Sequence, residues 1–246
     1  MFRHQGDKRT FKHNLYLAMM LSMIAGSVNS VGFLAIKTLT TNVTGHFAYF
    51  ADELIQRDPL ESFIFLSYIL SFLLGAATSS FFVELTSRYT PRRAFVVPIF
   101  IEIAVLFYVS TWDTNRITTD THKIAHLLLF AMGLQNALVT QVSNAVVRTT
   151  HLTGLFTDLG IELSQLPFYW RDKKKQNLLQ SIGLRSTIII FFLIGCLSGG
   201  YGFSKISLHT LKITSLVLFG AIIFDNVKYH YYALKRKIRE VTTDPL

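Results

Sequence analysis

The sequence predicts an all-α protein that crosses a lipid bilayer several times. Only 16% of its 246 residues are charged, whereas soluble domains average about 25%. Hydrophobic residues make up 50% of the chain and are gathered into long apolar segments. The basic residues behind the net charge of +9 lie in clusters, each next to an apolar segment. These observations predict a polytopic helix bundle forming a single membrane domain over residues 1–246.

Six apolar segments come close to the roughly 20 residues that a helix needs to cross a bilayer, although the third is short. They are residues 15–36, 63–83, 94–109, 124–147, 182–203 and 208–224. The first is too long for a signal peptide and lacks a small-residue cleavage site, so we expect it to be a spanning helix.

The basic clusters indicate a membrane rather than a nucleic-acid partner. They lie at residues 3–12, 88–93, 171–175 and 228–239, without interleaved aromatic residues to stack on bases. Lys and Arg concentrate on the cytoplasmic side of membrane proteins. We therefore expect all four clusters, and both termini, in the cytoplasm. The single cysteine, Cys196, excludes an internal disulfide.

A short segment occurs twice in the chain. Residues 41–54 recur at 150–163 with a constant offset of 109, and each copy follows a long apolar segment. Upstream, two further residues match with an offset of 107. The matched pairs are Gly26/Gly133, Asn29/Asn136, Thr41/Thr150, Thr44/Thr153, Gly45/Gly154, Glu53/Glu162 and Leu54/Leu163. This pattern indicates an internal duplication.

The duplication bears on topology through two shorter stretches, residues 42–57 and 151–170. If both cross the bilayer there are eight spans, and the cluster at 88–93 lies outside. If neither crosses there are six spans, with every basic cluster on one side, which the charge rule favours. Three crossings per half then make an inverted repeat, an arrangement common in secondary transporters. We expect repeat one at about 15–110, a linker at 111–123, repeat two at about 124–226 and a cytoplasmic tail at 227–246.

Amide side chains are the first candidates for a solute site. Asn136, Thr140, Asn144 and Arg148 are spaced by four, with Gln135 beside them, and Asn29 occupies the first helix. Such spacing predicts one polar helix face, which should avoid lipid and line the bundle interior. The alternatives are amides that only bond helix to helix, and an Arg148 that reaches the interface.

The duplicated segment predicts a helix start in each half. Thr41 or Thr44 can cap the first, and Gly45 allows close approach of backbone or ligand. Half-helices starting inside the membrane would direct unpaired N–H groups and positive dipole ends toward each other. His46 and His151 lie beside the starts and can titrate near neutral pH. The alternative is a pair of amphipathic interfacial helices.

Three carboxyl groups are candidates for proton or cation coupling. Asp158 and Glu162 share a helix face, and Glu102 lies in the middle of an apolar segment. At membrane depth such groups are costly unless they have a partner or a function. If the helix that carries Asp158 and Glu162 emerges among the headgroups, these two are simply solvated.

These motifs resemble the YoaK-like family of bacterial membrane proteins of unknown function. The resemblance covers about residues 15–224, through residues 26–34, Thr44-Gly45, residues 133–136 and the Arg-Thr-Thr-x-x-Thr-Gly segment at 148–154. Family members commonly carry Asp at Asn29 and Asn at His46. The resemblance implies about six spans in a bacterial cytoplasmic (inner) membrane, and it implies no substrate.

No enzyme signature is present, so we expect neither an enzyme nor a cofactor or metal site. We expect a transporter or channel for a small polar or anionic solute, in contact with the lipid bilayer; a homo-oligomer is left open. The alternatives are a sensor, scaffold or assembly protein, and a membrane enzyme using Asp158 and Glu162. The expected solute-binding residues are Asn29, Thr41, Thr44, Gly45, His46, Gln135, Asn136, Asn144, Arg148, Thr150, His151, Thr153 and Gly154, with Glu102, Asp158 and Glu162 for coupling.

Overall fold

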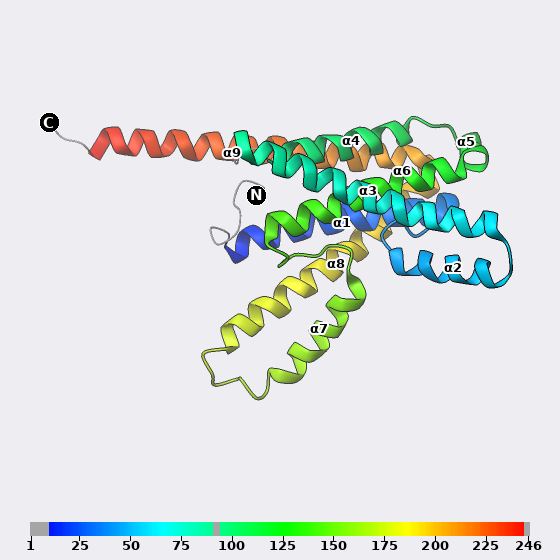
Figure 1. The fold of residues 1–246 in the computed structure, drawn as a ribbon. Coiled ribbons are helices and arrows are strands. Elements are labelled where there is room, and N and C mark those ends of the chain that lie inside the picture. The colour runs from blue at the N-terminus through cyan, green and yellow to red at the C-terminus, as the bar shows by residue number, and fades with distance from the viewer. Residues whose placement is uncertain (1–9, 91–93, 244–246) are drawn as a thin grey trace.

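The computed structural model describes residues 10–90 and 94–243, with side chains placed except at Thr114 and from 228 onward. All regular structure in these residues is helical (Figure 1). Of the predicted basic clusters, Arg3, Lys8, Arg9, Arg92 and Arg93 fall outside the described residues.

The six apolar segments form the long helices. They correspond to α1 (Phe11–Ile36), α3 (Pro59–Tyr89), α4 (Val96–Ser110), α6 (Thr121–Ser143), α8 (Lys175–Ile206) and α9 (Thr210–Thr243), the last preceded by a 3-10 turn, η3 (Ser207–His209). Four stretches are long and apolar enough to span a bilayer, and the fourth, Lys175–Val227, contains both α8 and the start of α9. The helical membrane bundle is therefore confirmed, while the number of crossings stays a prediction.

The two short stretches form α2 (Val43–Ile55) and α7 (Leu152–Gln165). With 13 and 14 residues they are about 20 Å long, too short for a hydrocarbon core of about 30 Å. Figure 1 shows α2 starting mid-way along the bundle and running to the right end, while α7 runs toward the left. The start of α1, the end of α9 and the turn into α8 all lie on the left. This arrangement supports the six-span prediction.

Hydrogen bonds show how each short helix begins inside the bundle. Thr41 follows the end of α1 but bonds to Asn29, seven residues before that end. Thr150 likewise bonds to Asn136, seven residues before α6 ends at Ser143. Seven helical residues rise about 10 Å, so the chain turns back by that depth in both halves.

Two glycine crossings hold the long helices together. A Cβ added at Gly26 of α1 would collide with the Phe192 carbonyl of α8, and one at Gly195 with the Met23 carbonyl. The other crossing pairs Gly133 of α6 with Phe72 of α3, and Gly75 with Phe130. Adding 107 to the α1 numbers and subtracting 120 from the α8 numbers converts the first set into the second. The repeated crossing supports the predicted duplication.

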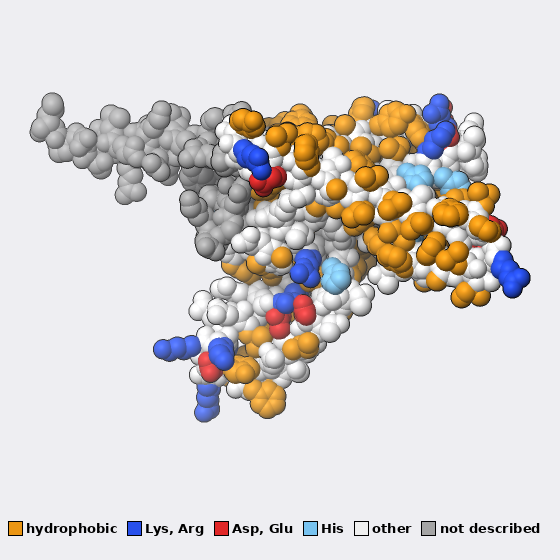
Figure 2. Space-filling model, in the orientation of Figure 1, with side chains coloured by type: hydrophobic (Ala, Val, Ile, Leu, Met, Phe, Trp, Pro, Cys, Tyr) orange, Lys and Arg blue, Asp and Glu red, His pale blue; other side chains and the backbone are white. Residues whose placement is uncertain are grey.

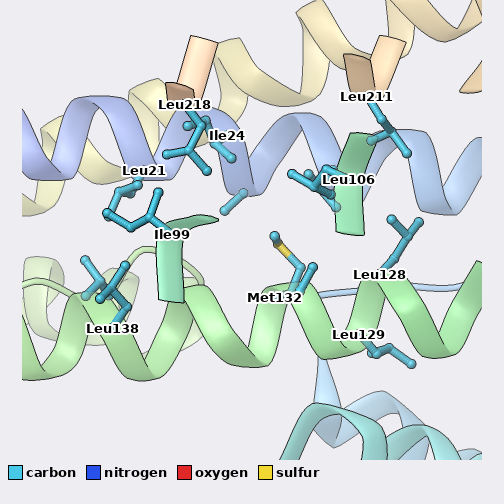
Figure 3. Close-up of a cluster of buried hydrophobic side chains, with 14 of the residues drawn as sticks. Leu21, Ile24, Ile99, Leu106, Leu128, Leu129, Met132, Leu138, Leu211 and Leu218 are labelled. Carbon is cyan, nitrogen blue, oxygen red and sulfur yellow. The ribbon is translucent and has the colours of Figure 1, made fainter. Parts of the chain in front are cut away.

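The hydrophobic core lies where α1 and α6 meet α4 and α9. Figure 3 shows side chains from these four helices converging on one another. The labelled members are Leu21, Ile24, Ile99, Leu106, Leu128, Leu129, Met132, Leu138, Leu211 and Leu218. On α3 and α8, by contrast, leucines such as Leu73 and Leu193 are more than half exposed, as a lipid-facing surface requires.

The ends of α1 and α6 correct one sequence prediction. Asn144 does not extend the helix: it is the C-cap of α6, in the left-handed conformation at φ 53°. Lys37 ends α1 in the same conformation at φ 55°, and 37 plus 107 is 144. The polar face predicted to run through Asn144 to Arg148 is therefore wrong, because the helix stops at Ser143. The predicted linker contains a further short helix, α5 (Thr114–Thr119), and the first residues of α6.

Candidate functional site: two loop–helix junctions

Each half-helix is anchored to the preceding long helix by an asparagine. Asn29 Oδ1 accepts hydrogen bonds from the Thr41 hydroxyl at 2.9 Å and from its backbone N–H at 3.3 Å. Asn136 Oδ1 accepts one from the Thr150 hydroxyl at 2.6 Å. We call these two contacts the Asn–Thr brackets. All four residues are partly buried and lie at the columns that the duplication matched.

The caps of the half-helices differ from the prediction. Neither Thr41 nor Thr44 caps α2: the cap is Asn42, whose Oδ1 accepts from the Gly45 N–H at 3.1 Å. Thr41 is turned away by its bracket. Thr44 is exposed on the first turn of α2.

The second junction has a different start. The N-cap of α7 is His151, which makes no side-chain capping bond, and Thr153 is exposed on the first turn. The exposed Arg148 lies in the loop three residues before this cap. A Cβ at Gly154 would strike the His151 ring, so glycine is needed for this ring to lie over the helix start.

Two other predicted solute ligands lie inside the protein. Gln135 is fully buried on α6, and its Nε2 donates to the Leu21 carbonyl of α1 at 2.8 Å. His46 is only 3% exposed, with its Nε2 bonded to the Leu39 carbonyl at 3.1 Å. Both side chains therefore hold neighbouring segments together in this structure.

His46 belongs to a polar group that the sequence analysis missed. Its ring packs edge-on against Tyr68 of α3, with ring centroids 5.5 Å apart. The Tyr68 hydroxyl is 2.7 Å from His122 Nδ1, and Ser71 Oγ is 2.7 Å from His126 Nδ1. His122 and His126 are spaced by four on α6, a signal that was available in the sequence.

The predicted coupling residues of α7 form an ion pair with α8. Arg185 lies 3.2 Å from an Asp158 oxygen and 2.5 Å from a Glu162 oxygen, and it also contacts Ser181. Arg185 was missed, although it is the one charged residue of the apolar segment 182–203.

Glu102 lies in the core without a partner. Its side chain is fully buried, and neither carboxyl oxygen has a hydrogen-bond partner among the described residues. It is flanked on α4 by Ile99 and Leu106, both members of the core in Figure 3. The hydroxyls of Thr40 and Thr149, again 109 residues apart, are also buried without a partner there.

The two halves present different surfaces. Figure 2 shows acidic, basic and histidine side chains together over the lower arm formed by α7 and α8. The α2–α3 region at the right shows mainly hydrophobic side chains, which include Phe47, Tyr49, Leu54 and Phe63. Charge therefore gathers at the second junction and not at the first.

The helix bundle and its two junctions define a multi-pass transmembrane protein. A family model described as "Protein of unknown function (DUF1275)" matches residues 17–224, so the chain belongs to this family. The chain is also similar to the UPF0700 transmembrane protein YoaK of Bacillus subtilis (strain 168), with 23% identity over 182 residues, or 74% of this chain and 80% of the relative. The resemblance read from the sequence is confirmed. No solved structure matches the chain significantly.

Proposed function

We propose that this membrane protein is a transporter or channel for a small polar or anionic solute, in a bacterial inner membrane with both termini cytoplasmic. The proposal places the solute between the starts of α2 and α7. The observation that carries it is the pair of Asn–Thr brackets, which hold two half-helix starts at matched depth in the bundle.

The physical basis is the electrostatics of helix starts. The first N–H groups of a helix have no partner within the helix, and the helix dipole adds partial positive charge there. In a bundle that excludes water, such a start attracts an anion or the negative end of a polar solute.

The second start is the stronger candidate for an anion. At α2, the Gly45 N–H is occupied by Asn42. At α7, the cap residue His151 makes no such bond, and Arg148 adds a positive charge nearby in the chain. The exposed Thr153 hydroxyl can donate a further hydrogen bond.

Flux into liposomes tests this proposal. Purified protein is reconstituted and screened for uptake of chloride, nitrate, formate and phosphate. Arg148→Ala and Thr153→Val are expected to lose at least 10-fold of the flux, about 1.4 kcal/mol in barrier. The matched controls are Arg116→Ala, an exposed arginine, and Thr157→Val, one turn along α7 from Thr153. Unchanged flux in both site variants would discard this site.

The second candidate is a non-transporting sensor, scaffold or assembly protein. It is favoured by one observation: the Asn29, Gln135 and Asn136 amides all make bonds within the protein. Polar side chains then serve only to join helices. Absence of flux for every solute, together with a stable partner found by crosslinking in membranes, would favour this candidate.

A further inference from the structure

The glycine crossings give a residue-by-residue register between the two halves. Helix α3 maps onto α8 with an offset of 120, since Gly75 and Phe72 correspond to Gly195 and Phe192. Helix α2 maps onto α7 with an offset of 109, as the Asn–Thr brackets require. His46 and Leu155, the buried residues of α2 and α7, are also 109 apart.

At equivalent positions, different chemistry joins each half-helix to the next long helix. Tyr49 of α2 stacks on Phe65 of α3, with ring centroids 5.1 Å apart and planes 23° apart. Adding the two offsets converts Tyr49 to Asp158 and Phe65 to Arg185, which form an ion pair at 3.2 Å. An aromatic stack in one half thus corresponds to a salt bridge in the other.

The salt bridge carries an excess negative charge. Arg185 faces two carboxylates, Asp158 and Glu162, so the group has a formal charge of −1 when all three are ionised. The Asp158 side chain is 52% exposed, but that of Glu162 is only 13% exposed. One Glu162 oxygen, Oε2, is buried without a hydrogen-bond partner in the described part of the chain. Burial disfavours an uncompensated charge, so Glu162 is the group that gains most from taking up a proton.

The surroundings of Glu162 leave few other charges to consider. Helix α7 packs against α8, which contributes Arg185 and the Ser181 hydroxyl. Its own helix contributes Asp158, one turn away. The first half has no counterpart of this pairing, because Tyr49 and Phe65 are held by ring contact.

We propose that Arg185 positions α7, and that a proton bound by Glu162 weakens this contact and lets α7 move away from α8. A neutral Glu162 keeps a hydrogen bond to Arg185 but loses the charge attraction, leaving the more exposed Asp158 to hold the guanidinium. The inference deepens the proposed function, because α7 carries the second helix start of the solute site. The protein then has a proton-operated latch on one half-helix and a pH-independent contact on the other.

Distances between spin labels test the latch without any solute. In a Cys196→Ala background, one label pair is placed through Gly160→Cys on α7 and Leu193→Cys on α8. The matched control pair uses Ala51→Cys and Leu73→Cys, the equivalent positions of the first half. All four positions are exposed, and a Cβ at Gly160 meets no atom within 4 Å. Lowering the pH from about 7.5 to about 4.5 covers the range in which carboxyl groups take up protons.

The latch predicts that acid shifts the 160–193 distribution to longer distances, reversibly, while the 51–73 distribution is unchanged. Glu162→Gln should give the shifted distribution at both pH values. The double change Asp158→Tyr with Arg185→Phe, which installs the pair of the first half, should give an unshifted distribution at both. The proposal is overturned if native protein shows no acid shift, if both label pairs shift alike, or if Glu162→Gln keeps the pH response. Loss of flux with an intact acid shift would reject the transport proposal alone.

Discussion

The Asn–Thr brackets use the same residue types in both halves but are not equally strong. Asn29 receives two hydrogen bonds from Thr41, one of them from the backbone, whereas Asn136 receives only the Thr150 hydroxyl. Removing the hydroxyl therefore leaves Asn136 Oδ1 without its bracket partner, while Asn29 keeps the N–H of residue 41. Leaving a buried polar group unpaired costs about 1–3 kcal/mol.

We therefore expect Thr150→Val to destabilise the protein by about 1–2 kcal/mol, and Thr41→Val by clearly less. Thermal unfolding in detergent would measure both. Thr44→Val and Thr153→Val, on exposed side chains, serve as controls with no expected change. An equal loss in the two bracket variants would contradict the role given to the Thr41 backbone bond.

Glu102 has the opposite expectation, because it occupies the core without a partner. Replacing a buried polar group that lacks partners by an apolar side chain removes a desolvation cost. We expect Glu102→Leu to raise the melting temperature in detergent, while any solute flux falls if the carboxyl couples transport. Glu84→Leu, at an exposed surface pair with Arg88, is the matched control. A lower melting temperature in Glu102→Leu would show that the carboxyl has a stabilising partner.

Among the elements, the glycine crossings fix how closely α1 approaches α8 and α3 approaches α6. Small residues let transmembrane helices pack backbone to backbone. Because each added Cβ would meet a carbonyl oxygen, the helices would have to separate. We expect Gly26→Ala and Gly133→Ala each to destabilise the protein by about 2 kcal/mol or more, as overpacking does.

The control for this expectation is Gly220→Ala on α9, where a Cβ meets nothing within 4 Å. Alanine there should stabilise the helix by up to about 1 kcal/mol. Monodispersity and melting temperature of the three variants are compared side by side. If Gly26→Ala is tolerated as well as Gly220→Ala, the crossing is not held by close backbone contact.

The elements also show what the sequence could predict and what it could not. Helix positions followed from apolar segments, and the brackets follow from columns that match at a constant offset. The polar face through Asn144 failed because one residue in the left-handed conformation ends α6, which periodicity alone does not reveal. Thr41 was a plausible cap, but Asn29 lies within reach and takes its hydroxyl. The Arg185 ion pair depended on a contact between α7 and α8 that spacing within α7 could not supply.

For the whole molecule, the two halves share a backbone plan but not a surface. The α2 side is joined by rings and presents apolar side chains, whereas the α7 side carries charges. An inverted repeat with this asymmetry would meet the two compartments with different chemistry. The latch on α7 and the candidate anion site beside it both belong to the charged half.

The central claim is that the two copies enter the bilayer from opposite faces, and cysteine accessibility tests it most directly. In a Cys196→Ala background, Arg57→Cys and Trp170→Cys report the turns that follow α2 and α7. A membrane-impermeant thiol reagent applied to intact cells should label position 57 at once and position 170 only after permeabilisation. Labelling of both positions from the same side would show that α2 and α7 cross the bilayer, and would contradict the inverted six-span arrangement.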